Sequence, residues 1–112
     1  MHIVTRIRIG NQRNFLGKGV KELLDAVDMY KSIKKASQIT GISYPKALRM
    51  LKIFEEEMGF SAVISEKGGS SYGGTVLSEK GKEVLESYKI IEKKVEDFAE
   101  DLLLKSDVFN TK

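Results

Sequence analysis

The segment between Ser32 and Gly59 constrains the fold more than any other part of the sequence. Ser32 is a residue type that caps helix N-termini, and Gly41 readily adopts the left-handed conformation that ends a helix. Ser43 then caps a second helix, and Pro45 fits its first turn, where a backbone N–H would have no partner. Gly59 ends that second helix. The spacing predicts two helices joined by a tight turn, which is the helix-turn-helix pattern.

The second of these helices has an apolar face and a cationic face. Its apolar residues repeat at spacings of four, three and four: Ala47, Leu51, Phe54 and Met58. At about 100° per residue they gather on one side, and Lys46, Arg49 and Lys52 lie on the far side. A helix of this shape fits the major groove of DNA, with its N-terminal half nearest the bases. We therefore expect Arg49 to contact guanine and Lys52 to contact a phosphate.

Charge is divided unevenly along the chain. Residues 1–54 contain eleven Lys and Arg residues and three acidic residues, a net charge of +8. Residues 55–112 contain eight Lys residues and thirteen acidic residues, a net charge of −5. Between Lys31 and Lys52 there are six cations and no acid. A block of one sign on a folded element indicates a polyanionic partner, and the alternative is a solvated basic face.

The remaining composition narrows the class of protein. The chain has 112 residues, the size of one small domain, with no cysteine and a single histidine, His2. Disulfides, zinc fingers and thiol catalysis are therefore excluded, and a Ser-His-Asp triad is nearly excluded. No stretch approaches the roughly 20 apolar residues of a membrane helix, and the N-terminus lacks the apolar region of a secretory signal. We expect a cytoplasmic binding module that is not an enzyme and needs no cofactor or metal.

The N-terminal third predicts one strand and one helix. Residues 2–9 alternate, with four residues on one face: Ile3, Thr5, Ile7 and Ile9. This alternation predicts a half-buried strand, followed by a turn at Gly10-Asn11. Residues 18–30 then place apolar side chains at helical spacing and predict a helix of the core.

A glycine-rich stretch separates two short apolar runs. Residues 62–64 and 75–77 are suited to strands, and together they predict a β-hairpin that projects as a wing. The stretch lacks the spacing of a phosphate-binding loop, so nucleotide binding is not expected. We expect four of its residues to contact the DNA backbone or the minor groove: Lys67, Ser70, Ser71 and Tyr72.

A long helix is predicted from Ser78 to about Leu104. Six apolar residues follow heptad spacing along it: Val84, Tyr88, Ile91, Val95, Phe98 and Leu102. A helix of this length, about 39 Å, is longer than a compact body of about 70 residues covers. The seam therefore predicts a homodimer. Packing across the chain's own domain is the alternative, and the stripe is broad enough for both.

The order of these elements resembles the DNA-binding domain of molybdate-responsive (ModE-type) regulators over about residues 3–88. The motifs that carry the resemblance are Ser32-Ile33…Ala36…Gly41-Ile42-Ser43-Tyr44…Ala47 and Gly68-Gly69…Gly73-Gly74…Val76-Leu77-Ser78…Gly81. The segment Ile42-Ser43-Tyr44-Pro45 is also similar, more remotely, to LysR-type winged helices. The resemblance implies a winged helix-turn-helix that binds duplex DNA.

The sequence departs from the ModE pattern at three points. Pro45 stands where that family usually has a basic or polar residue, so the resemblance implies no particular base preference. Glu66 and Lys67 stand where it often has an arginine, which leaves the contact of the wing open. The family's C-terminal oxyanion-binding modules have no counterpart before Lys112, so molybdate sensing is not implied.

Together these features predict a mainly α fold with a small β-sheet. Residues 1–77 are expected to form a winged helix-turn-helix DNA-binding domain, and residues 78–112 a long C-terminal dimerisation helix with a tail. The expected function is sequence-specific binding of double-stranded DNA at a pseudo-palindromic site by a homodimer, hence transcriptional regulation. The expected DNA contacts are Ser32, Lys34, Ser43, Tyr44, Lys46, Arg49, Lys52, Lys67, Ser70, Ser71 and Tyr72.

An alternative function is a winged-helix module for protein–protein interaction or assembly, without DNA binding. The feature in its favour is the acidic run Glu55-Glu56-Glu57, which could dock a basic partner.

Overall fold

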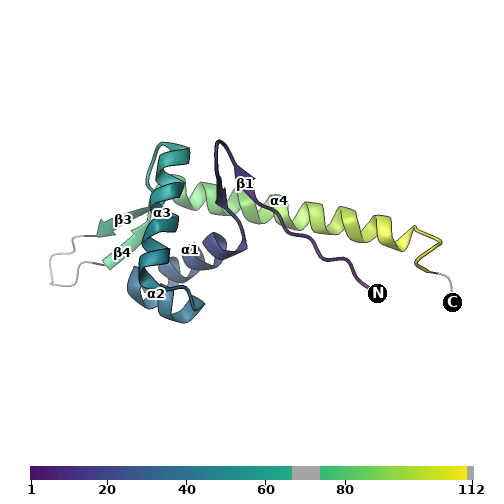
Figure 1. Ribbon diagram of the computed structural model, residues 1–112, viewed down its shortest axis with the longest axis horizontal. Helices are drawn as coiled ribbons and strands as arrows, with labels where there is room; N and C mark the ends of the chain where they lie inside the picture. Colours follow the sequence, from purple (N-terminus) through teal and green to yellow (C-terminus); the bar gives the residue numbers. More distant parts are fainter. Residues whose placement is uncertain (67–73, 111–112) are drawn as a thin grey trace.

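The computed structural model describes residues 1–66 and 74–110 (Figure 1). Four helices carry most of this described part: α1 (Lys18–Tyr30), α2 (Ile33–Thr40), α3 (Tyr44–Met58) and α4 (Glu79–Leu104). Two small antiparallel sheets complete it: β1 (Ile9–Gly10) with β2 (Asn14–Leu16), and β3 (Val63–Glu66) with β4 (Gly74–Leu77). The chain is therefore mainly helical, with a long C-terminal helix, as the sequence predicts.

Helix α1 is the centre of the core. Leu23, Leu24 and Val27 are completely shielded from solvent, and α1 packs against α2, α3, α4, β2 and β4. Phe54 of α3 is equally buried and makes edge-on ring contacts with Phe15, at 5.6 Å between centroids, and with Phe60, at 5.9 Å. These contacts join α1, α3 and the segments on either side of them into one core.

The caps of α2 and α3 lie where the sequence predicts them. Ser32 Oγ accepts a hydrogen bond from the backbone N–H of Lys35 at 3.0 Å, and Ser43 Oγ accepts one from that of Lys46 at 3.3 Å. Gly41 and Gly59 end the two helices at φ angles of 76° and 81°, a region that favours glycine. The predicted bounds of both helices are confirmed, because they follow from these local backbone requirements.

The predicted hairpin is also confirmed in its two strands. β3 and β4 pair antiparallel from Val63 opposite Leu77 to Glu66 opposite Gly74. The N–H of Thr75 donates to the carbonyl of Lys31 at 2.9 Å, which ties β4 to the end of α1. The hairpin is thereby held against the helical core.

The predicted strand over residues 2–9 is wrong in its extent. Only Ile9 and Gly10 pair as a strand, with Leu16 and Asn14 of β2. Residues 1–8 run along α4 without strand pairing (Figure 1). The alternation in the sequence still appears as alternating burial, with Thr5 and Ile7 half-buried and Arg6 and Arg8 exposed. The face of this segment packs against a helix instead of a second strand, so its backbone has no ladder partner.

Helix α4 begins in a tight contact with the β3 segment. Ser78 Oγ accepts from the N–H of Gly81 at 2.9 Å and donates to the carbonyl of Ser61 at 2.6 Å. The N–H of Ser78 donates to the carbonyl of Ala62 at 2.9 Å. Gly81 is required here, since a methyl group on it would overlap the Ala62 carbonyl oxygen.

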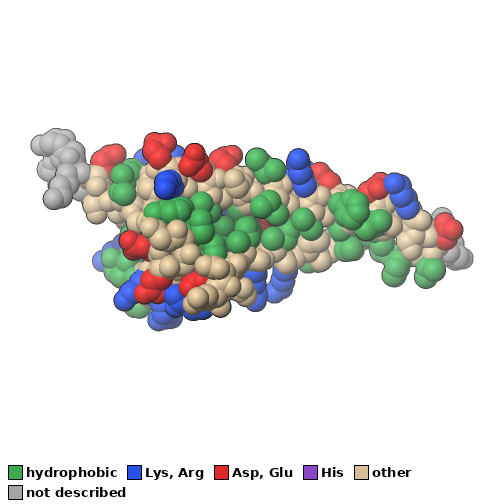
Figure 2. Space-filling view, turned by 90° about the horizontal axis from the view of Figure 1, so that it is seen from above, with side chains coloured by type: hydrophobic (Ala, Val, Ile, Leu, Met, Phe, Trp, Pro, Cys, Tyr) green, Lys and Arg blue, Asp and Glu red, His purple; other side chains and the backbone are tan. Residues whose placement is uncertain are grey.

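The second half of α4 projects from the body. Buried residues of α4 lie only in its first three turns: Gly81, Leu85 and Tyr88. Beyond them the helix extends as a rod, and the described chain spans 63 Å along its longest axis against 28 and 23 Å across it. Figure 2 shows apolar side chains along the projecting part. Within residues 1–66 and 74–110, no helix is both long enough and apolar enough to cross a membrane.

We expect Gly81→Ala to lower the free energy of unfolding by about 1–3 kcal/mol, because the added methyl group pushes the start of α4 away from Ala62. Gly19→Ala is the matched control, since Gly19 also lies in a first helical turn and a Cβ there would meet Met50 at an ordinary 3.5 Å. This control should be neutral or stabilising by up to about 1 kcal/mol. Urea denaturation of both variants measures the difference, and equal stabilities would contradict the close approach at Gly81.

Candidate nucleic-acid interface

Helix α3 buries the apolar face that its sequence predicts and exposes its cations. Ala47, Leu51 and Phe54 are buried. Lys46, Arg49, Lys52 and the preceding Ser43 are exposed, and Tyr44 and Leu48 retain 44% and 41% of their accessible surface. The exposed face of α3 therefore combines positive charge with two apolar side chains.

The three cations of α3 do not occupy equivalent places. Met50 and Ile53 are half-buried because they pack on the core and line a groove of about 260 Å³ with Phe15 and Leu16. Lys46 precedes Met50 by four residues and Ile53 by seven, so it lies on their side of the helix. Lys46 thus marks the edge of the exposed face, and Arg49 and Lys52 lie nearer to its centre.

These cations have no counterion in the part of the chain that the structure describes. Among the described residues, no ion pair or hydrogen bond engages the side chains of Lys34, Lys46, Arg49 or Lys52. Four cations of α1, of α4 and of the C-terminal cap of α4 are paired instead: Lys21 with Glu92, Lys89 with Asp25, Lys93 with Asp97 and Lys105 with Asp101, at 2.6–2.8 Å. The donors of α2 and α3 thus remain available to an external anion.

Helix α2 adds further donors near the same turn. Lys34 is exposed, and the ammonium of Lys35 lies 5.2 Å from the centroid of the Tyr30 ring. Ser32 and Ser43 use their oxygens to cap helices, and a capping hydroxyl retains its hydrogen for donation. Lys35 was not expected as a contact from the sequence, although its place in the block without acids could have indicated it.

Four of the expected DNA contacts, Lys67, Ser70, Ser71 and Tyr72, lie outside the described residues. The structure describes the hairpin up to Glu66, which is exposed, and again from Gly74.

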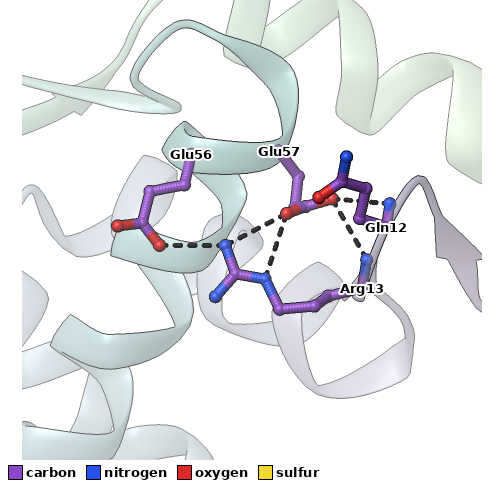
Figure 3. Close-up of polar contacts among 4 residues, drawn as sticks. All are labelled: Gln12, Arg13, Glu56 and Glu57. Carbon is purple, nitrogen blue, oxygen red and sulfur yellow. Dashed lines mark hydrogen bonds and ion pairs between the residues drawn. The ribbon is translucent and has the colours of Figure 1, made fainter.

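A cluster that the sequence did not predict holds α3 at its C-terminal end (Figure 3). Glu57 accepts hydrogen bonds from the backbone N–H groups of Gln12 and Arg13, at 2.9 and 3.1 Å, and from Arg13 Nε at 3.0 Å. The same guanidinium reaches Glu56 at 3.0 Å. The partners are more than 40 residues apart, so no local pattern reveals them. Two of the three glutamates suggested for a basic partner are bound to Arg13, while Glu55 is exposed.

The contacts of Glu57 lower the pKa of its carboxyl group. Hydrogen bonds from the Arg13 backbone, assisted by its guanidinium and by the Gln12 N–H, hold the pKa of Glu57 below the ordinary carboxyl value of 4.5. In return, the two glutamates raise the pKa of Arg13. The cluster therefore stays charged at neutral pH and ties the turn between β1 and β2 to α3.

The predicted dimer seam is divided in two. Tyr88 is buried in the core of its own chain, where its hydroxyl donates to the carbonyl of Ile7 at 2.7 Å, and Val84 packs against that core. Burial also raises the pKa of Tyr88. The four later seam residues remain exposed: Ile91 at 43%, Val95 at 42%, Phe98 at 66% and Leu102 at 54%.

The described residues form other grooves besides the one beside α3. A second groove of about 260 Å³ lies between Ile9, Met58 and the start of α4, and its lining is mostly apolar. In the described ranges, no group of three or more His, Asp or Glu residues is arranged to hold a metal ion.

No protein-family model matches this chain, and no curated protein is significantly similar to it.

We expect the Glu57 cluster to make stability pH-dependent on the acid side. Because the pKa of Glu57 is lowered on folding, its contribution is present above the ordinary value of 4.5 and is lost as pH falls through the lowered value. Urea denaturation on both sides of that pH should show a weaker decline for Glu57→Gln than for the native chain. Glu55→Gln, the same change at an exposed neighbour, should retain the native decline. Identical profiles for the native chain and Glu57→Gln would contradict the role of this cluster.

Proposed function

We propose that this protein is a winged helix-turn-helix module that binds double-stranded DNA as a homodimer and thereby regulates transcription. The observation that carries the proposal is the exposed face of α3, where Arg49 and Lys52 have no counterion among the described residues. Helix α2 and the first three turns of α3 contain no acidic residue. Cations gathered on one surface without counterions repel one another, and a phosphate backbone would neutralise them.

The distribution of charge along α3 supports docking by its N-terminal half. Its cations lie between Lys46 and Lys52, and its acids follow at Glu55–Glu57, of which two are held by Arg13. An approaching DNA duplex is therefore attracted by the first half of the helix and repelled by the last turn. In this arrangement Arg49 donates to a guanine edge, Lys52 contacts a phosphate, and Lys46 reaches the backbone beside the groove.

The residues around the turn would position the module on the backbone. Ser32 and Lys34 stand at the N-terminus of α2, where unpaired N–H groups and the helix dipole favour an anion. Ser43 and Tyr44 occupy the corresponding place on α3. Lys67, Ser70, Ser71 and Tyr72 are proposed as contacts of the wing. The exposed part of the α4 seam supplies the homodimer contact.

A second candidate function is a protein–protein assembly module. The specific observation in its favour is the partial exposure of Tyr44 and Leu48 on the outer face of α3, beside the acidic Glu55. Aromatic and apolar side chains of this kind serve protein interfaces as well as DNA grooves. The two functions differ in their dependence on salt and on a duplex.

Binding of the purified protein to a fluorescent random duplex across a salt series tests the proposal. We expect the logarithm of affinity to fall linearly with the logarithm of salt concentration, with a slope that corresponds to several released counterions. Absence of binding at low salt would overturn DNA binding and favour the assembly module.

Single substitutions on α3 separate base contacts from phosphate contacts. We expect Arg49→Ala to weaken binding to a selected site by about 1–3 kcal/mol and to relax specificity at one position. Lys52→Ala should weaken all sequences alike and reduce the salt slope by about one unit. Lys82→Ala removes the same charge from an exposed site on α4 and should leave affinity close to native. Equal losses for Arg49→Ala on every sequence would instead make Arg49 a phosphate contact.

A further inference from the structure

The projecting half of α4 has an apolar stripe that no described residue covers. Ile91, Val95, Phe98 and Leu102 follow one another at spacings of four, three and four, so they lie within an arc of about 60° on the helix. Apolar side chains are visible along this rod in Figure 2. A stripe of this spacing is the seam of a coiled coil.

The N-terminal segment lies against a different side of α4. A hollow that Arg6 and Ile7 line also involves Tyr88 and Glu92, and a second one near Met1 involves Glu100 and Leu103. By helical spacing these α4 residues are centred roughly 110° from the stripe. The stripe thus stays open to another molecule even with residues 1–8 in place.

We propose that a second copy of this chain covers the stripe with its own α4 running antiparallel. This proposal specifies the orientation of the homodimer named in the proposed function. What it implies for DNA binding rests on that proposed function. The two-fold axis would pass between Glu96 and Asp97. Val95 then packs against Phe98 of the partner subunit, and Ile91 packs against Leu102 of the partner subunit. Each layer pairs a β-branched side chain with a longer one.

The charges that flank the stripe select this orientation. In heptad terms Ile91 and Phe98 are d positions, Val95 and Leu102 are a positions, and the adjacent g positions are Lys94 and Asp101. An antiparallel pair places g beside g, so Lys94 faces Asp101 of the partner subunit, and the symmetry repeats this contact. A parallel pair places g beside e, so Lys94 would face Ala99 of the partner subunit and no attraction would result.

The ion pairs within the chain leave room for this contact. Among the described residues Lys94 has no ion pair. Asp101 binds Lys105 at 2.8 Å and keeps 53% of its side-chain surface, so a second cation has access to it.

The charge distribution along the projecting half of α4 also favours the antiparallel orientation. Residues 89–94 contain three lysines and one glutamate, whereas residues 96–101 contain four acids and no cation. Antiparallel packing brings the basic part of one helix beside the acidic part of the other. Parallel packing would place the two acidic parts side by side, which is unfavourable.

The first half of α4 lowers the entropic cost of this association. Leu85 and Tyr88 already anchor the helix in the core, so dimerisation orders no new helix. The antiparallel arrangement also separates the two bodies. At about 1.5 Å per residue, the two copies of Leu85 lie about 35 Å apart along the rod, close to one turn of duplex DNA. Half-sites spaced by one turn or more, rather than adjacent ones, follow for the proposed operator.

Disulfide trapping tests the orientation, because the native chain contains no cysteine. Ile91→Cys and Leu102→Cys are made in separate chains, oxidised alone and as a mixture, and examined on a non-reducing gel. Antiparallel packing predicts cross-linked dimers only in the mixture, since equivalent residues would be about 16 Å apart and a disulfide needs less than about 7 Å between Cα atoms. Cross-linking of each variant alone would overturn the proposal, and so would the absence of cross-links in every sample.

Charge reversal gives a second readout that does not depend on a new thiol. We expect Lys94→Glu to weaken dimerisation about tenfold in sedimentation equilibrium, because two attractive contacts become repulsive. Adding Asp101→Lys to that chain should restore most of the affinity. An unchanged dimer constant for Lys94→Glu would overturn the assigned register. Circular dichroism of each variant checks that α4 remains folded.

These measurements are made without DNA, so they are independent of the salt series. A dimer trapped antiparallel by a chain that does not bind DNA would sustain the orientation and refute the proposed function. A chain that binds DNA but gives the cross-links of a parallel pair would sustain the proposed function and refute the antiparallel orientation.

Discussion

The position of α3 depends on the burial of Phe54. Its side chain is fully buried and its ring meets Phe15 and Phe60 edge-on, so one side chain joins α3 to the segments that contain Phe15 and Phe60. Buried aromatic side chains of this kind contribute more than area alone, because their ring edges and faces attract each other. With Phe54 inside, helical geometry leaves Arg49 and Lys52 on the surface. The candidate interface is thus a consequence of core packing.

Electrostatics divides the molecule into a self-paired part and an unpaired part. Lys21, Lys89 and Lys93 find carboxylates across the α1–α4 contact or one turn away on α4. Helices α2 and α3 carry a cluster of cations without such partners in the described chain, and only Arg13 draws on the acidic end of α3. Positive charges on a rigid element that lack internal counterions are available to bind an external polyanion. The same reasoning applies to Lys94, whose proposed partner lies in a second copy.

The helices were predictable because their boundaries are local. Ser32, Gly41, Ser43 and Gly59 act on backbone groups three or four residues away, and the structure places each cap where the sequence indicates it. The structure of residues 2–9 was not predictable in this way. Alternation indicates which side chains are buried, but it does not indicate whether the backbone pairs with another strand. Arg13 and Glu57 illustrate the limit further, since their contact spans 44 residues and has no spacing rule.

Periodicity and caps within a turn were sufficient to predict the helix pair, the hairpin strands, the length of α4 and the cationic face of α3. The point at which the seam of α4 changes from core to surface depends instead on tertiary packing. Tyr88 is enclosed because the N-terminal segment and α1 meet there, whereas Ile91 and the seam residues after it lie beyond the reach of the body. Heptad spacing is the same on both sides of that point. A one-dimensional pattern identifies an apolar face, and three-dimensional packing determines what covers it.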